Sequence, residues 1–212
     1  KCFKEIMNKN IKTFNLWAQD GRDRKMADNH LAPVNKMIEI IKKETNKIEN
    51  SFKFLDLGCG NGWVVKKIAQ YKNCKYAMGI DGAKNMIKNA KKNSIGDFQL
   101  SNIESFNYKF KFDVIFSMET FYYLNDLNKV FQNIYHKGIK NNGLFIMGID
   151  HYKENTPSLN WDKEYNLELN TLSMNEWEDL FLNHGFKNIK RYQYGSNKDW
   201  QGTFIIMGEK LK

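Results

Sequence analysis

Phe54-Leu55-Asp56-Leu57-Gly58-Cys59-Gly60-Asn61-Gly62-Trp63 is the stretch of this sequence that decides the fold. The apolar run from Phe52 to Leu57 is bounded by turn formers and predicts a buried parallel strand. Three glycines at alternate positions follow, and Val64, Val65 and Ile68 begin a helical period. This order leaves free backbone N–H groups at the carboxyl end of the strand, where glycine lets a ligand approach the main chain. The spacing is not the G-x-G-x-x-G of dinucleotide-binding enzymes.

Strand and helix patterns alternate from Phe52 onward, which predicts a parallel sheet with helices on both faces. The turn formers Asn141-Asn142-Gly143 are expected to precede the fifth strand, and a capping box at Ser173 and Glu176 predicts a helix that Gly185 ends. The expected strands cover residues 52–57, 76–80, 98–100, 113–117 and 144–149, with closing strands at 186–194 and 202–208.

The segment before the first strand, residues 1–50, predicts a helical cap or lid on a single domain formed by residues 51–212. Pro33 and the apolar residues that follow it at helical spacing predict a helix over 33–47. Residues 17–26 read as a less regular piece, either a surface connection or a flap over a cofactor. Residues 150–172 are polar without clear periodicity, as in a loop that covers a substrate.

Composition narrows the class of protein further. The 212 residues suffice for one α/β domain, and no apolar run reaches the roughly 18 residues that a membrane helix needs. The three cysteines have no metal-ligand spacing and suit a reducing, cytoplasmic compartment. The net charge of +9 invites a nucleic-acid interpretation, but nearly all basic residues are scattered lysines, so a solvated Lys- and Asn-rich surface is favoured.

The motif from Asp56 to Gly62 resembles the first motif of the Rossmann-like, class I S-adenosylmethionine-dependent methyltransferases. The resemblance implies a doubly wound, mostly parallel seven-stranded sheet with helices on both faces and a C-terminal antiparallel hairpin. It also implies S-adenosylmethionine as the cofactor and S-adenosylhomocysteine as the product. The alternative is a glycine-rich turn that binds nothing. Contacts with the cofactor are expected from Asp56, Gly58, Cys59, Gly60 and Trp63.

Asp81 ends the second expected strand, which places it beside the glycine turn. An acidic side chain there can accept hydrogen bonds from both ribose hydroxyls, although Asp at this position is also a common helix N-cap. Gly82 and Met86 are expected along the adenine. Asn102 stands where the family usually has an acidic residue for the adenine amino group, and the Ile103 N–H is expected to serve a ring nitrogen.

The segment after the fourth strand should face the donor methyl group. Ser117 and Met118 are expected near the methionine portion of the cofactor, and Glu119 and Tyr122 are the candidate catalytic residues, since a carboxylate beside a sulfonium is electrostatically favourable. The alternatives are a helix cap for Glu119 and a core position for Tyr122. His151, after the fifth strand, is a candidate base or a structural histidine.

Trp17 and Arg24 are further candidates, as cofactor contacts from the flap. In-line methyl transfer requires no metal, and the sequence shows no carboxylate and histidine cluster for one. With Pro33 and Pro157 as the sole prolines, the adjacent-proline motif of amino-methylating DNA enzymes is absent, and no cysteine follows the fourth or fifth strand. The predicted function is therefore methyl transfer to a small molecule. An RNA methyltransferase and a non-catalytic binding module remain the alternatives.

Overall fold

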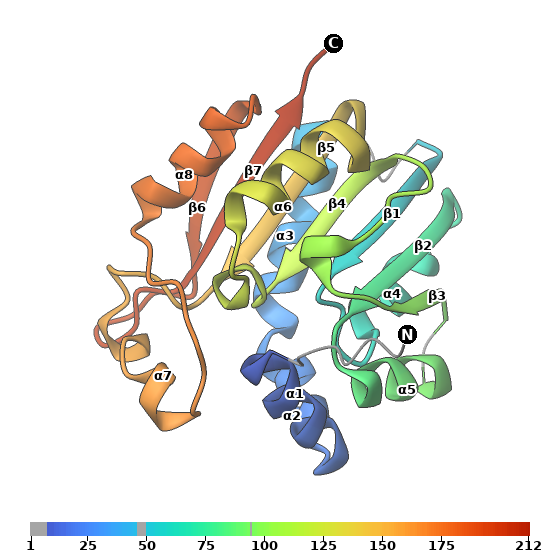
Figure 1. The fold of residues 1–212 in the computed structure, drawn as a ribbon. Coiled ribbons are helices and arrows are strands. Elements are labelled where there is room, and N and C mark those ends of the chain that lie inside the picture. The colour runs from blue at the N-terminus through green and yellow to red at the C-terminus, as the bar shows by residue number, and fades with distance from the viewer. Residues whose placement is uncertain (1–7, 46–49, 94) are drawn as a thin grey trace.

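A seven-stranded sheet forms the middle layer of the protein (Figure 1). The structure is a computed structural model, and it describes residues 8–45, 50–93 and 95–212. The strand order is β3-β2-β1-β4-β5-β7-β6. The strands are β1 (Phe52–Leu57), β2 (Cys74–Asp81), β3 (Asp97–Leu100), β4 (Phe112–Met118), β5 (Ile139–Ile149), β6 (Lys187–Tyr194) and β7 (Thr203–Lys210).

The first five strands pair in parallel, whereas β7 is antiparallel to both β5 and β6. The order reverses at β1, because the chain runs outward through β2 and β3 and then returns to β4 on the other side. Ligands of open α/β sheets bind at such a switch point, outside the carboxyl ends of the strands. The predicted doubly wound sheet with its C-terminal hairpin is confirmed.

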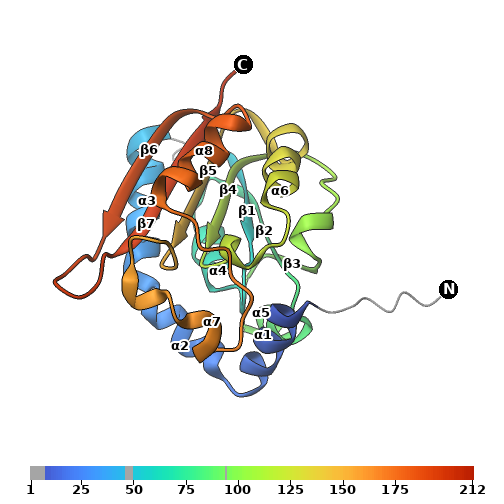
Figure 2. The same cartoon turned by 60° about the vertical axis from the view of Figure 1, so that its left-hand side comes forward.

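Helices cover both faces of this sheet (Figures 1 and 2). The core on one face includes apolar side chains of α6 and α8, and the core on the other face includes side chains of α3, α4 and α5. The α-helices are α1 (Lys9–Gln19), α2 (Arg22–Asn29), α3 (Leu31–Thr45), α4 (Trp63–Ala69), α5 (Lys84–Asn93), α6 (Leu127–Asn133), α7 (Trp161–Glu164) and α8 (Met174–Asn183). Shorter turns are η1 (Ile103–Ser105), η2 (Phe121–Tyr123), the π-helical η3 (Ile134–Gly138) and η4 (Thr156–Ser158).

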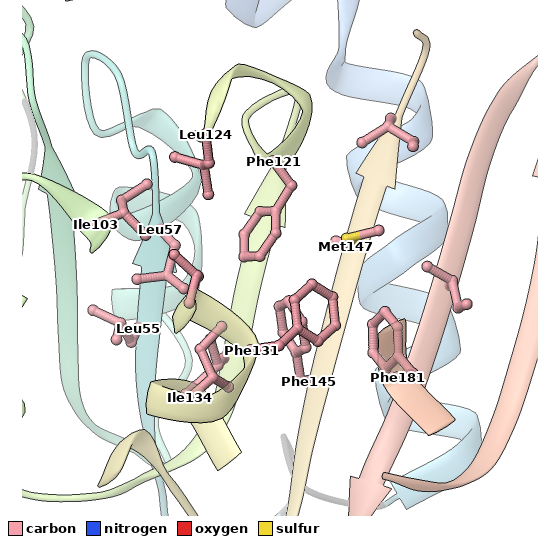
Figure 3. Close-up of a cluster of buried hydrophobic side chains, with 14 of the residues drawn as sticks. Leu55, Leu57, Ile103, Phe121, Leu124, Phe131, Ile134, Phe145, Met147 and Phe181 are labelled. Atoms are coloured by element: carbon pink, nitrogen blue, oxygen red, sulfur yellow. The ribbon is translucent and has the colours of Figure 1, made fainter. Parts of the chain in front are cut away.

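The core between the sheet and α6 and α8 is rich in aromatic rings (Figure 3). Phe145 of β5 stacks on Phe181 of α8 with ring centroids 5.0 Å apart, and Phe131 of α6 meets both rings edge-on. Such aromatic contacts stabilise the core beyond the area they bury. They hold the ends of β4 and β5, which carry the candidate site, in fixed positions.

Three local expectations differ from the structure. Residues 17–26 are helical rather than irregular, because Gly21, with φ of 76°, joins α1 directly to α2. The turn expected at 141–143 is a bulge within β5, where Asn142 has φ of 59° and the pairing with β4 shifts. The polar segment 150–172 contains η4 and α7. The described part of the predicted helix 33–47 lies within α3, which begins two residues earlier, while residues 46 and 47 lie outside the described residues.

None of the helices in the described ranges combines the length and the apolar character needed to cross a bilayer.

The capping box at the start of α8 gives a first prediction, for stability. Ser173 Oγ accepts the Glu176 N–H at 3.2 Å, and a Glu176 carboxylate oxygen accepts the Ser173 N–H at 2.7 Å. Ser173→Ala should lower the free energy of unfolding by about 1 kcal/mol, measured by urea denaturation. Ser196→Ala, at an exposed position between β6 and β7, is the control and should change it by less than about 0.5 kcal/mol. Equal effects from the two variants would contradict this role of the cap.

Candidate active site

A cleft lies at the carboxyl ends of β1, β2 and β4. Helices α1 and α2 lie at this end of the sheet (Figures 1 and 2). It encloses about 1060 Å³ of empty space, open solvent at its mouth included, which is ample for a nucleoside-sized ligand and a second small molecule. The cap contributes residues from Asn8 to His30 to its wall. The other lining residues come from the glycine turn, the ends of β2 and β4, and η1.

The glycine turn has the backbone that its sequence demands. Gly58, Gly60 and Gly62 have φ angles of 83°, 52° and 80°, in the left-handed region that favours glycine. A Cβ on Gly58 would lie 2.1 Å from the Thr120 side chain, and one on Gly62 would lie 2.6 Å from Phe98, so close packing also requires these two glycines. A Cβ on Gly60 would meet nothing nearer than Met86 Sδ at 4.0 Å. The space above Gly60 is therefore open to a ligand.

Most of the turn's N–H groups are engaged, contrary to the expectation of free donors. Gly58 and Cys59 donate to the Ile80 carbonyl at 2.9 and 3.0 Å, and Gly62 donates to the Cys59 carbonyl at 2.9 Å. Gly60 donates to Asp81 Oδ2 at 2.9 Å. The reason is the adjacent end of β2, whose carbonyl and carboxylate lie within reach of the turn. The cleft consequently offers a ligand open space and a carboxylate rather than a row of backbone donors.

Asp81 lies beside the turn, as predicted, and its side chain has two structural bonds. Besides Gly60, its Oδ1 accepts the Ala83 N–H at 2.8 Å, which is the interaction of a helix start. Burial raises the pKa of Asp81, and the two N–H donors oppose that rise. Each carboxylate oxygen keeps further acceptor capacity toward the cleft. The ribose-binding and helix-capping interpretations are thus compatible.

The cleft is acidic, although the protein is basic overall. Its lining residues, all in the described ranges, include no lysine and no arginine. Burial, followed by the charge of Asp81, raises the pKa of Asp56, and burial also raises the pKa of the Cys59 thiol. Such a cleft suits a cationic ligand and is unsuited to a polyanion. The carboxylates that line it are Asp23, Asp56, Asp81, Glu104 and Glu119.

The cap is attached to the core mainly through asparagine side chains. Asn10, buried on α1, donates to the carbonyls of Tyr123 at 3.2 Å and Glu168 at 2.7 Å, and its Oδ1 accepts the Glu168 N–H at 2.8 Å. Asn85 and Asn89 on α5 bond to the carbonyls of Asn15 and Ala18 on α1, each at 3.2 Å. The sequence analysis missed Asn10, since an isolated asparagine in a helix carries no local signal.

At the η1 end of the cleft, the polar groups bond to one another. Asn102 and Ile103 line the cleft, as predicted, but Asn102 Oδ1 accepts the Glu104 N–H at 2.8 Å and so caps η1. The Glu104 carboxylate accepts the N–H groups of Asn125 and Asp126, the latter at 3.1 Å. Glu104 therefore ties η1 to the start of α6.

At the opposite end, Glu119 occupies a strained position directly after β4. Its φ of 54° is unusual for a residue other than glycine, and such strain is concentrated at functional sites. Its carboxylate accepts the Tyr122 hydroxyl and the Asp150 N–H, both at 2.5 Å. Burial, then the charge of Asp150, raises the pKa of Glu119 to about 8. Tyr122 is fully buried and reaches the site through this bond to Glu119.

Two side chains that the sequence analysis did not select join Glu119. His30 Nε2 lies 4.0 Å from Glu119 Oε2 and 3.7 Å from Asp150 Oδ2. Burial alone would lower the pKa of His30, but the neighbouring carboxylates of Asp150 and Glu119 raise it to about 9. This corrects the expectation that the chain has no cluster of carboxylates and histidine. The position of His30 depends on how α2 and α3 pack, and the sequence pattern does not predict that packing.

Besides Tyr122, four of the candidate residues lie outside the cleft lining. His151 is buried, with Nδ1 3.0 Å from the Ser158 carbonyl and Nε2 2.8 Å from Thr171 Oγ1. Ser117 Oγ donates to the Leu57 carbonyl at 2.7 Å. Trp17 packs edge-on against Phe14 and against Tyr165 of the 150–172 segment, and Arg24 is exposed. The remaining cofactor candidates line the cleft: Asp56, Gly58, Cys59, Gly60, Trp63, Asp81, Gly82, Met86, Asn102, Ile103 and Met118.

Comparison with known proteins identifies the family. Residues 48–199 match the family described as "Methyltransferase domain", which covers most of the chain. The chain belongs to this family, and its fold is that of the class I S-adenosylmethionine-dependent methyltransferases. The predicted family and its cofactor, S-adenosylmethionine, are confirmed.

Curated relatives share parts of the sequence. A malonyl-[acyl-carrier protein] O-methyltransferase from Bacillus anthracis is 36% identical over 92 residues, which are 41% of this chain and 34% of that protein. A ubiquinone biosynthesis O-methyltransferase from Pelagibacter ubique is 29% identical over 177 residues, 80% of this chain and 72% of that protein. The chain spans between 34% and 44% of the length of the first three curated relatives that it matches.

Solved structures share the fold. A chain from the complex between the Haloferax volcanii Trm112 methyltransferase activator and a methyltransferase has a TM-score of 0.76 and 21% identity, covering 94% of this chain and 98% of that one. An S-adenosylmethionine-dependent methyltransferase from Listeria monocytogenes has a TM-score of 0.65 and 19% identity, covering 82% of this chain and 97% of that one.

Attachment of the cap by Asn10 gives the second prediction. Asn10→Ala leaves the Glu168 carbonyl and the Glu168 N–H, which bond to Asn10 in a partly buried setting, without their partner, at a cost of about 1–3 kcal/mol. This cost lowers the free energy of local opening of α1, so hydrogen exchange of the α1 amides should accelerate by roughly tenfold or more. Thr13→Ala, which removes an exposed bond within α1, is the control. Equal exchange rates in wild type and Asn10→Ala would show that Asn10 does not hold the cap.

Proposed function

We propose that this protein is an S-adenosylmethionine-dependent methyltransferase that transfers a methyl group to an oxygen atom of a small molecule. The observation that carries the proposal is the open space above Gly60, beside the Asp81 carboxylate. Membership of the methyltransferase domain family supports the activity. Two curated relatives are named O-methyltransferases, which supports an oxygen acceptor.

In this proposal the acidic cleft binds a cationic cofactor. Asp81 accepts the ribose hydroxyls, and the space above Gly60 admits the backbone-facing part of the ligand. Ile103 and Met86 contact the adenine, whereas Met118 faces the methionine portion. The sulfonium is attracted by the surrounding carboxylates, whose effect is strong because the cleft is partly withdrawn from water.

The reaction itself is an in-line displacement at the methyl carbon. The bond from the acceptor oxygen to the methyl carbon forms while the bond from carbon to sulfur breaks, and the electron pair of the latter stays on sulfur. The chief contribution of the protein is to align the two reactants, an effect that corresponds to effective molarities of about 10⁵ M or more. Helices α1 and α2 line the cleft and form the lid over the acceptor, and the 150–172 segment packs against α1 through Tyr165 and Trp17.

The third prediction tests cofactor binding. Asp81→Asn removes the charge that a ribose hydroxyl would meet, and a hydrogen bond to a charged group contributes about 1.5–3 kcal/mol. Calorimetry should therefore show S-adenosylmethionine binding weakened by roughly tenfold or more. Glu39→Gln, on the exposed surface of α3, should bind like wild type. Melting curves of both variants without ligand check the fold.

Failure of wild type to bind either S-adenosylmethionine or S-adenosylhomocysteine would contradict the proposed function. Binding without any release of S-adenosylhomocysteine, over hydroxyl, carboxylate and amine acceptors, would instead favour the non-catalytic binding module. Turnover with amines alone would contradict an oxygen acceptor.

A further inference from the structure

Three potential ligand groups from separate parts of the chain converge at one end of the cleft. They are His30 at the end of α2, Glu119 after β4 and Asp150 after β5, and their ligand atoms all lie within 4.8 Å of one another. The ligand atoms of one divalent ion lie about 3 Å apart when adjacent and about 4 Å apart when opposite, since each bond is about 2.1 Å long. Inward side-chain shifts of about 1 Å or less would bring the three groups to that geometry.

The orientation of His30 is that of a metal ligand. Its Nδ1 lies 2.7 Å from the Met26 carbonyl, so this nitrogen carries the proton and donates it. A ligating histidine typically donates its other ring N–H to a backbone carbonyl in this way. Nε2 faces the two carboxylates at 3.7 and 4.0 Å, which exceeds the range of N–H···O hydrogen bonds, and a metal ion bound there would replace the proton on this nitrogen. The distances leave space for an ion between the three groups.

Glu119 is held in place by the kind of outer contacts that support metal ligands. Tyr123 donates to the Tyr122 hydroxyl at 3.1 Å, and Tyr122 in turn donates to Glu119 Oε2. The Asp150 N–H fixes the other oxygen. Outer hydrogen bonds of this type orient a ligating carboxylate, and each oxygen retains a further lone pair.

Asp150 gives a second, independent indication. The residue is 8% exposed, and its Oδ1 is a buried atom with no hydrogen-bond partner among the described residues. A buried carboxylate oxygen without a partner is costly, because it has lost its water and gained nothing in return. The other oxygen, Oδ2, lies 3.7 Å from His30 Nε2, so a cation that both oxygens of the carboxylate coordinate would relieve this cost.

We propose that His30, Glu119 and Asp150 form a binding site for a divalent cation at the acceptor end of the cleft. A mixed set of one imidazole nitrogen and two carboxylates favours an ion such as Mn²⁺ or Zn²⁺ over Ca²⁺. Three protein ligands leave coordination positions open for a substrate oxygen, as in catalytic rather than structural sites. The two carboxylates balance the charge of the ion.

The role of this cation site rests on the proposed function, to which it adds a way of binding the acceptor. A cation bound there would coordinate the acceptor oxygen and lower the pKa of an acceptor hydroxyl, so that the oxygen attacks the methyl carbon as an anion. The class of acceptor is then a molecule with an ionisable hydroxyl beside a second oxygen, which together fill the open positions. His30, from the cap, would connect closure of the lid to binding of the ion.

The test is to remove metal from the protein with a chelator, add Mn²⁺ and measure its binding by electron paramagnetic resonance. Wild type should bind one ion, and pulsed spectra should show coupling to a ¹⁴N nucleus. His30→Gln should abolish the ¹⁴N coupling, and Asp150→Asn should weaken Mn²⁺ binding by roughly tenfold or more. Glu104→Gln changes a cleft carboxylate outside the cluster, so it is the matched control and should bind Mn²⁺ like wild type.

Asp150→Asn keeps the shape of the side chain, and melting curves of both cluster variants without metal check that they are folded. Absence of Mn²⁺ and Zn²⁺ binding to folded wild type would overturn the site, as would binding that both cluster variants retain unchanged. Calorimetry of the metal-free protein with S-adenosylmethionine keeps the two proposals apart. Cofactor binding without metal binding overturns the site alone, whereas loss of cofactor binding overturns the proposed function.

Discussion

The site depends on the Asp81 carboxylate, which joins three pieces of the chain through two hydrogen bonds. Its oxygens accept N–H groups from the glycine turn after β1 and from the start of α5, while Asp81 itself ends β2. The left-handed backbone at Gly60 is needed to present that N–H. One carboxylate thus fixes the floor of the cleft, and in the proposed function the same group also receives the cofactor.

Charge is segregated between the cleft and the outer surface. The chain carries a net charge of +9, but the described residues that line the cleft carry carboxylates and neither lysine nor arginine. The lysines thus lie outside the cleft, and a cleft lined by carboxylates suits a cationic ligand better than an anionic one. The overall charge therefore says little about the ligand, because the local potential inside a low-dielectric cleft is set by its nearest groups.

The sequence predicted the sheet, the glycine turn and Asp81, because strand and turn signals are local and parallel strands end at one edge. It did not predict His30, whose place is decided by packing of helices before β1. Asp150 and His151 show a second limit. Both residues follow the end of β5, where strand alternation no longer applies, and the chain turns so that His151 bonds to the Ser158 carbonyl while Asp150 faces the cluster.

The asparagine contacts of the cap also determine how it responds to its surroundings. Three of the bonds that hold α1 join neutral amides to backbone carbonyls. Dissolved ions screen interactions between charges but leave bonds between neutral groups almost unaffected. Docking of α1 is consequently insensitive to ionic strength, in a protein whose lysine-rich exterior responds strongly to it. The hydrogen bonds through which α1 covers its part of the cleft are thereby independent of the salt content of the medium.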